Sequence, residues 1–108
     1  MIISGGENVY PTEVEAVLGQ HPDIKDVAVV GLPDEKWGER VAAAVVLREG
    51  SVLTAETLVE WTRGHLAGFK RPREVTFLAS DEMPRNTTGK ILHRVLRDLL
   101  SHHTGDRT

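Results

Sequence analysis

Two nearly continuous apolar segments limit what this chain can fold into more than any other feature of its sequence. Residues 26–32 and 41–47 are rich in valine and alanine, and each has the length of a strand. Such short apolar runs are typical of buried strands. The connector between them, residues 33–38, is too long for a two-residue hairpin turn. The sequence therefore predicts two buried strands joined by a longer loop.

Helical patterns accompany these strands. Residues 12–18 have helical apolar spacing, and Thr54 can cap a helix that extends to about residue 64. Residues 74–78 alternate as a third strand. Thr88 can cap a last helix, whose apolar residues are spaced to form one face: Leu92, Val95, Leu96, Leu99 and Leu100. The predicted fold class is α+β, with a small central sheet of about three strands flanked by helices and an amphipathic C-terminal helix.

The composition is that of a soluble globular protein with one domain. The chain has 108 residues, of which 40% are hydrophobic and 27% are charged. It has no cysteine, which excludes disulfides and thiolate metal sites and fits a cytoplasmic location. No apolar run approaches the length of a membrane span, and the N-terminus lacks the basic region of a signal peptide.

Charge is distributed unevenly along the chain. Residues 1–60 contain 4 Lys and Arg against 11 Asp and Glu, whereas residues 61–100 contain 8 against 4. The acidic first part argues against a nucleic-acid partner, because nucleic-acid binders are usually basic overall. The basic second part suits a small anionic ligand or an acidic facing surface, and the simpler alternative is solvated surface charge.

The segment Pro84–Lys90 places a lysine directly after a glycine, at the predicted start of the last helix. Hydroxyl groups, free backbone N–H groups and an ammonium group at such a position suit a phosphate or carboxylate. The segment is not a nucleotide P-loop, because Pro84 stands where the first glycine should be and Ile91 replaces the required Ser or Thr. The alternative is that Lys90, Arg94 and Arg97 form a solvated basic face opposite the leucines.

An ordered set of motifs resembles the adenylate-forming superfamily, which includes acyl-CoA synthetases, the adenylation domains of peptide synthetases, and luciferases. The pattern Pro-Arg-x-x-x-Gly-Lys-x-x-x-Arg is filled by Pro84, Arg85, Gly89, Lys90 and Arg94. Further matches, in the expected order, are ISGGENVYP (residues 3–11), VAVVGLPD (27–34), WGE (37–39) and FKRP (69–72). The sequence of residues 3–11 is most similar to the corresponding segment of acyl-CoA synthetases. The resemblance identifies residues 1–100 as the mobile C-terminal domain of such an enzyme, followed by a frayed polar tail at 101–108.

This resemblance implies a two-step reaction with ATP and coenzyme A (CoA). A carboxylic acid first attacks the α-phosphate of ATP and releases pyrophosphate, and the CoA thiol then displaces AMP to give a thioester. Lys90 matches the catalytic lysine that bridges the carboxylate and the ribose–phosphate oxygens in the first step, after which the domain rotates. The positions that match the CoA-binding side are Gly5 and Gly6, in the pantetheine tunnel, and Trp37, Phe69 and Arg71, near the CoA nucleotide.

Less specific interpretations of these residues stay open. The Gly5–Gly6 pair is only a turn in one alternative, Trp37 fills the space under a loop in another, and Phe69 belongs to the core in a third. Lys70 and Arg73 are predicted to be surface charges. The five histidines lack the spacing of metal ligands, so no metal site is predicted.

The resemblance also implies a much larger N-terminal adenylation domain, which is missing here together with the family's hinge. That domain would hold the adenine pocket, the acyl pocket and most contacts to Mg²⁺. We therefore expect a fragment or separately expressed domain that is inactive alone, with the N-terminal domain and a carboxylic acid as its partners. The alternative is a stand-alone accessory or binding module of the same fold. The presence of Lys90 and of Gly5–Gly6 favours the catalytic domain, because a binding module needs neither.

Overall fold

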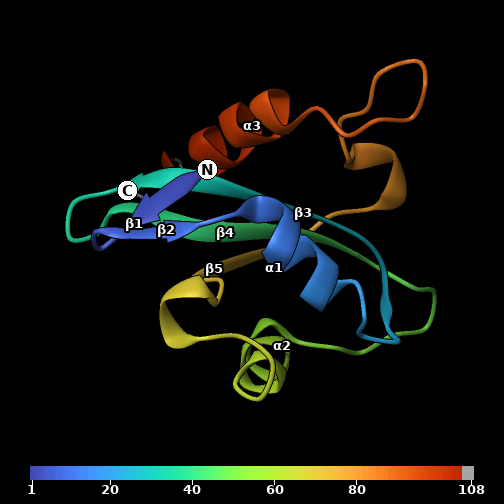
Figure 1. Cartoon of the computed structure of the whole chain (residues 1–108). Coiled ribbons are helices and arrows are strands. Elements are labelled where there is room, and N and C mark those ends of the chain that lie inside the picture. The colour runs from blue at the N-terminus through green and yellow to red at the C-terminus, as the bar shows by residue number, and fades with distance from the viewer. Residues whose placement is uncertain (106–108) are drawn as a thin grey trace.

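A five-stranded sheet forms the centre of the computed structural model, which describes residues 1–105. Helix α3 covers one face of the sheet, and α1 and α2 lie on the other (Figure 1). The elements in chain order are β1 (Ile2–Ser4), β2 (Glu7–Val9), α1 (Pro11–Leu18), β3 (Ile24–Asp34), β4 (Gly38–Leu47), α2 (Ala55–Thr62), η1 (Gly68–Lys70), β5 (Glu74–Phe77), η2 (Ser80–Glu82) and α3 (His93–Gly105). The predicted α+β class is confirmed. The sheet has more strands than expected, because β1 and β2 are too short to produce a recognisable periodicity.

The long β3–β4 hairpin is the backbone of this sheet. The two strands pair in antiparallel register from Ile24↔Leu47 to Asp34↔Gly38, so residues 35–37 connect them. The prediction of a loop longer than two residues is confirmed. The strand order is β2-β1-β4-β3, and β5 lies parallel to β4. β1 reaches β4 through the pair Ser4↔Gly38, which places the β1–β2 hairpin beside the 35–37 loop.

β4 is apolar over most of its length because both faces of the sheet are covered. Val41, Ala43 and Val45 pack in the cluster with α1 and α2. The residues between them, Ala42 and Ala44, pack in the cluster with α3. All five side chains are fully buried, as the two-residue period of a strand between two helical layers requires.

Helix α2 begins as the sequence predicts. Thr54 accepts a hydrogen bond from the Thr57 N–H (3.2 Å), and the Thr57 hydroxyl accepts one from the Thr54 N–H (3.1 Å). These reciprocal bonds satisfy two N–H groups that the helix cannot pair internally. Leu58 is buried and Trp61 is half-buried against the same core cluster.

Helix α3 begins at His93, so the prediction that Thr88 caps it is wrong. Residues 85–91 form a separate loop, which is closed by a β-bridge between its two ends. The reason lies in Asn86, whose side chain accepts the N–H groups of Thr88 and Lys90. Asparagine offers the backbone a local turn in place of a helical one, and here the turn delays the helix.

Only part of the apolar face predicted for α3 is buried. Leu96 and Leu100 pack on the sheet, and Leu92 is half-buried. Val95 and Leu99 remain 50% and 44% exposed. The helical spacing is correct, but the sheet lies against one row of side chains rather than against the whole stripe.

Helix α3 extends to Gly105, and the end of the predicted tail, residues 106–108, lies outside the described residues. The domain boundary near residue 100 stays a prediction. Within residues 1–105, no helix combines the length and the apolar character that crossing a membrane requires.

Glu15 connects three elements at the free edge of the sheet. Its Oε2 accepts a hydrogen bond from the backbone N–H of Val29, on the terminal strand β3 (2.8 Å). The same oxygen lies 2.7 Å from Nε2 of His93 at the start of α3. One carboxylate of α1 therefore reaches both the sheet edge and the opposite helical layer.

Candidate functional site

One side chain, Asn86, organises the loop that carries Lys90. Its Oδ1 accepts hydrogen bonds from the Thr88 N–H (3.0 Å), the Thr88 hydroxyl (2.7 Å) and the Lys90 N–H (2.9 Å). The Asn86 N–H in turn donates to the Lys90 carbonyl (2.9 Å). Both backbone polar groups of Lys90 are therefore held by the same residue, although Lys90 lies in a loop.

The side chain of Lys90 is exposed, and its ammonium group has no hydrogen bond or ion pair with the side chains of residues 1–101 or with the described backbone. The neighbouring Arg85 differs, since it forms an ion pair with Asp26 and donates to the Gly89 carbonyl (3.0 Å). The expected location of Lys90 in the first turn of a helix is wrong, because α3 begins three residues later. The loop presents an unpaired positive charge on a fixed backbone, which is an arrangement that an incoming anion can use.

The Gly5–Gly6 pair forms the two-residue turn of the β1–β2 hairpin. Both residues have positive φ, 59° and 82°, which a type I′ turn requires and which glycine adopts without steric cost. The Gly5 N–H donates to the Trp37 carbonyl (2.8 Å), and a Cβ added at Gly5 would lie 2.8 Å from the Trp37 ring. A Cβ at Gly6 would meet nothing within 4 Å. The pair is a turn, and Gly5 is also a point of close approach to the indole.

Trp37 is half-buried in the loop between β3 and β4. Gly5 lies against its ring, and the guanidinium carbon of Arg73 lies 4.0 Å from the ring centroid. The Lys36 ammonium group lies 5.0 Å from the same centroid. Cations over an indole face are attracted by the ring's electron density. The indole is therefore part of a surface that combines an aromatic ring with two positive charges.

The sequence analysis missed Arg73, which it treated as a solvated charge. Arg73 is exposed, but its stacking on Trp37 places it beside a residue predicted to bind CoA. Its position two residues after Arg71, in the FKRPR segment, was the available signal. Lys70 was also assigned to the surface, and it forms an ion pair with Glu13 (2.8 Å).

Phe69 and Arg71 have structural contacts of their own. Phe69 is half-buried and packs against the core cluster that includes α1 and α2, as the alternative interpretation of this residue expects. Arg71 donates from Nε to the Leu66 carbonyl (3.1 Å) and from Nη2 to the Arg63 carbonyl (3.4 Å). These carbonyls follow the end of α2, so Arg71 holds the chain there. The predicted roles of both residues in CoA binding stay predictions.

The predicted site residues fall into two separate groups. In Figure 1 the loop that carries Lys90 protrudes at the upper right, whereas the β1–β2 turn lies at the far left, where the 35–37 loop joins it. Gly5 and Trp37 are in contact, and neither approaches Lys90. One hollow of about 490 Å³ lies between α1, β3 and α3, and it is lined by none of these three residues. Both groups are surface features rather than walls of an enclosed pocket.

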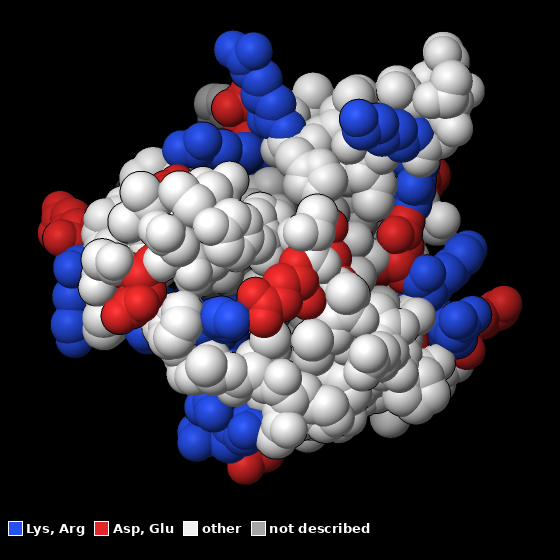
Figure 2. All heavy atoms as spheres, viewed as in Figure 1, with Lys and Arg blue, Asp and Glu red and all other residues white. Residues whose placement is uncertain are grey.

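Positively charged side chains lie along α3. Lys and Arg side chains stand along the upper edge of the molecule in Figure 2, on the side where Figure 1 shows α3. Arg94 is exposed, and its side chain has no partner among the described side chains of residues 1–101. Arg97 is about half exposed, with Glu39 at 3.9 Å. Two exposed arginines, Arg94 and Arg97, therefore lie on α3, the helix that follows the Lys90 loop.

The chain belongs to the AMP-binding enzyme C-terminal domain family, which matches residues 13–90. The predicted membership of the acyl-CoA synthetase branch of the adenylate-forming superfamily is confirmed by its relatives. Indoleacetate–CoA ligase from Aromatoleum aromaticum is 50% identical over 104 residues, which are 96% of this chain and 20% of that protein. 4-Chlorobenzoate–CoA ligase from Pseudomonas sp. strain CBS-3 is 47% identical over 102 residues, 94% of this chain and 19% of that protein.

Solved structures agree with this assignment. A fatty acyl CoA synthetase from Mycobacterium tuberculosis superposes with a TM-score of 0.87 at 50% identity, over 95% of this chain and 20% of that one. ATP-bound MatB from Rhodopseudomonas palustris superposes with a TM-score of 0.86 at 38% identity, over 92% of this chain and 19% of that one. The chain thus spans about a fifth of the length of the curated relatives that it matches.

Proposed function

We propose that this chain is the C-terminal domain of an ATP-dependent acid–CoA ligase and supplies it with two reactive surfaces. The observation that carries the proposal is the separation of two groups on one small domain. An unpaired lysine stands at one end, and an aromatic surface with glycine and arginine stands at the other. Each surface suits one half of a two-step reaction.

Lys90 serves the first step. A carboxylate oxygen attacks the α-phosphorus of ATP, the bond to the β-phosphate oxygen breaks, and pyrophosphate leaves. Both reactants are anions that repel each other, so a positive charge between them lowers the barrier by positioning and neutralisation. The Lys90 ammonium group is free to do this, because no carboxylate among the described side chains, those of residues 1–101, pairs with it. Its backbone is already fixed by Asn86, which reduces the entropy lost when the anions bind.

The Gly5 and Trp37 surface serves the second step. The CoA thiolate attacks the acyl carbon, and AMP leaves with the electron pair of the acyl–phosphate bond. Without side chains at Gly5 and Gly6, a thin pantetheine arm can pass close to the backbone. The indole of Trp37 offers a stacking surface for the adenine of CoA, and Arg71 and Arg73 bring positive charge for its phosphates.

Because the two surfaces lie at opposite ends, they cannot face one reaction centre together. The domain therefore has to turn between the steps, so that Lys90 leaves as Gly5 and Trp37 arrive. The acyl pocket, the adenine pocket and the hinge belong to an N-terminal adenylation domain. Among the side chains of residues 1–101, no three His, Cys, Asp or Glu residues gather to hold a metal. The contacts to Mg²⁺ are assigned to the N-terminal domain, as the resemblance to the family implies.

The test is to combine this chain with an N-terminal adenylation domain from a relative, as one linked enzyme, and to assay both half-reactions over a panel of carboxylic acids. The chain alone and the N-terminal domain alone are the controls. We expect pyrophosphate release and thioester formation to depend on both parts, and the acid preference to follow the N-terminal domain. If the linked enzyme works no better than the N-terminal domain alone, the chain is a stand-alone binding module and the proposal is wrong.

A further inference from the structure

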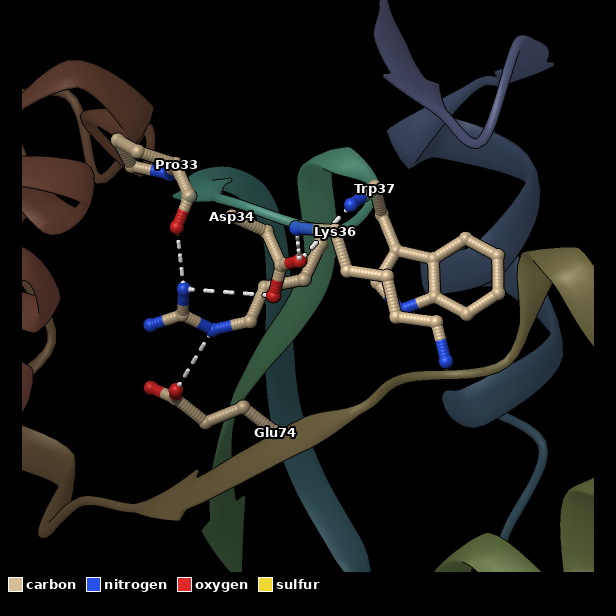
Figure 3. A network of polar contacts seen from close by, with 6 residues as sticks. Pro33, Asp34, Lys36, Trp37 and Glu74 are labelled. Carbon is tan, nitrogen blue, oxygen red and sulfur yellow. Dashed lines mark hydrogen bonds and ion pairs between the residues drawn. The ribbon is translucent and has the colours of Figure 1, made fainter.

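A half-buried network of charged side chains lies on the other side of the 35–37 loop from the Trp37 indole (Figure 3). It joins Asp34 at the end of β3, Arg40 in β4 and Glu74 at the start of β5. Arg40 and Glu74 are only 17% and 18% exposed, whereas the surface ion pair of Arg63 and Glu60 is 62% and 71% exposed. Charges that are shielded from water interact more strongly and hold a more definite geometry than solvated ones.

Asp34 holds the loop that carries the indole. Its Oδ1 accepts hydrogen bonds from the backbone N–H groups of Lys36 and Trp37, both at 2.9 Å. An aspartate that accepts from the backbone two and three residues onward closes a tight turn. The direction in which Trp37 leaves the backbone is therefore set by the position of one carboxylate.

Arg40 fixes that carboxylate and the strand end beside it. Its Nη1 donates to the Pro33 carbonyl and lies 4.0 Å from Oδ2 of Asp34. Its Nε donates to Oε1 of Glu74 at 3.1 Å. The planar guanidinium group uses separate N–H donors for these contacts, which a lysine cannot do. Arg40 thus ties the base of the β3–β4 loop to the start of β5.

The start of β5 holds Trp37 from a second direction. The Arg73 N–H donates to the Val41 carbonyl (2.8 Å), and the Arg73 side chain stacks on the indole. The next residue, Glu74, pairs with Arg40. Two consecutive residues, Arg73 just before β5 and Glu74 at its start, therefore act on the same loop, one on the indole ring and one through Arg40 on the turn.

We infer that Arg40 and Glu74 are positioning residues for the thioester-forming step, because they hold the turn that orients Trp37 against Gly5. This inference rests on the proposed function of Trp37. When the Arg40–Glu74 pair is broken, Asp34 loses its support and the 35–37 loop gains freedom, so ordering the indole costs part of the CoA binding energy. Lys90 lies at the other end of the domain, so the adenylation step is unaffected.

The experiment uses the linked enzyme and three variants: Glu74→Gln, Arg40→Gln and the double variant. Each single variant should raise the KM for CoA about tenfold, the size expected for one charge-assisted hydrogen bond, with pyrophosphate release unchanged. The double variant should be little worse than Arg40→Gln alone, because Arg40→Gln already removes the interaction with Glu74 together with the Arg40 contacts to Pro33 and Asp34. Glu60→Gln, which removes the partner of an exposed ion pair, is the matched control and should change nothing.

A second measurement reports on the indole itself. In the 108-residue chain with Trp61→Phe, Trp37 is the sole tryptophan, and acrylamide should quench its fluorescence faster after Glu74→Gln. Additive effects of the two single variants, equal damage to both half-reactions, or unchanged quenching would each overturn the inference.

The variant Trp37→Ala separates the proposed function of Trp37 from the positioning role of Arg40 and Glu74. If it leaves the KM for CoA unchanged, the proposed role of Trp37 is wrong; if it raises that KM while the Arg40 and Glu74 variants do not, only the positioning role is wrong.

Discussion

The Lys90 loop and the Trp37 loop present their side chains in opposite ways. Lys90 extends into solvent without a partner, and only its backbone is held, by Asn86 from within the same loop. Trp37 is half-buried and is contacted by the β1–β2 turn, by Asp34 at the end of β3 and by Arg73 just before β5. One region offers a free charge on a local support, and the other offers a built surface that depends on distant parts of the chain.

This difference teaches what each region tolerates. A free charge works through its sign and its reach, so its function is lost when the charge is lost. The stability of the fold then changes little. A built surface works through shape, so its function is sensitive to changes in several elements. Substitutions that separate these two behaviours test the comparison.

The largest effect is expected for Lys90→Ala in the linked enzyme. Removing one preorganised charge contact should lower the rate of adenylation about 10²- to 10³-fold. Conversion of preformed acyl-adenylate to thioester should stay near normal, because Lys90 has then left the reaction centre. Pyrophosphate release and thioester formation are measured separately, with Lys25→Ala as a control for loss of an exposed lysine. Equal damage to both steps would contradict the division into two surfaces.

Gly6 offers a matched pair of variants on the other surface. Gly6→Ala and Gly6→Leu introduce the same backbone strain at a φ of 82°, and within the chain neither side chain meets a nearby atom at Cβ. We expect Gly6→Leu to lower thioester formation roughly 10- to 100-fold beyond Gly6→Ala, because its bulk enters the pantetheine path. Adenylation should be the same in both. Two variants that behave alike in both half-reactions would mean that Gly6 is only a turn residue.

Asn86→Ala tests whether the local support of Lys90 matters when the charge remains. The variant removes the acceptor of three hydrogen bonds, so the loop should lose order and the adenylation rate should fall about tenfold. Thioester formation from acyl-adenylate should not change. Thr87→Ala, in the same exposed loop, is the control. An unchanged adenylation rate would show that Lys90 needs only its charge and its reach.

The smallest effect is expected for Thr54→Ala, which belongs to neither region. It removes the capping box of α2 and should lower the free energy of unfolding by about 1 kcal/mol, as measured by urea titration of the chain. Both half-reactions of the linked enzyme should be unaffected at 25 °C. A change in CoA binding would mean that α2 contributes to the Trp37 surface, through the Arg71 contacts that follow it.

The sequence predicts what depends on local patterns. The β3 and β4 runs, the Thr54 cap and the apolar period of α3 are all visible in it, because each reflects the chain's own periodicity or hydrogen bonding. The start of α3 was predicted wrongly, since Asn86 and Thr88 are both good capping residues and only the folded loop shows which one directs the backbone.

The candidate site also contains residues that local patterns predict and residues that they do not. Lys90 and the Gly5–Gly6 pair stand out in the sequence because their motifs are contiguous. The stacking of Arg73 on Trp37 and the pairing of Arg40 with Glu74 join residues more than thirty positions apart. Such contacts depend on the parallel alignment of β5 with β4, which no local pattern specifies.

Glu15 has a consequence for how copies of this molecule meet. A terminal strand such as β3 displays unpaired N–H groups that a strand of another molecule can bind, which is a common route to aggregation. The Glu15 carboxylate already occupies the Val29 N–H, and it puts a negative charge in the path of an approaching strand. Natural sheets use charges and covering helices at their edges to discourage edge-to-edge association. Here a charged side chain from a helix blocks one pairing position in the middle of the longest strand of the domain.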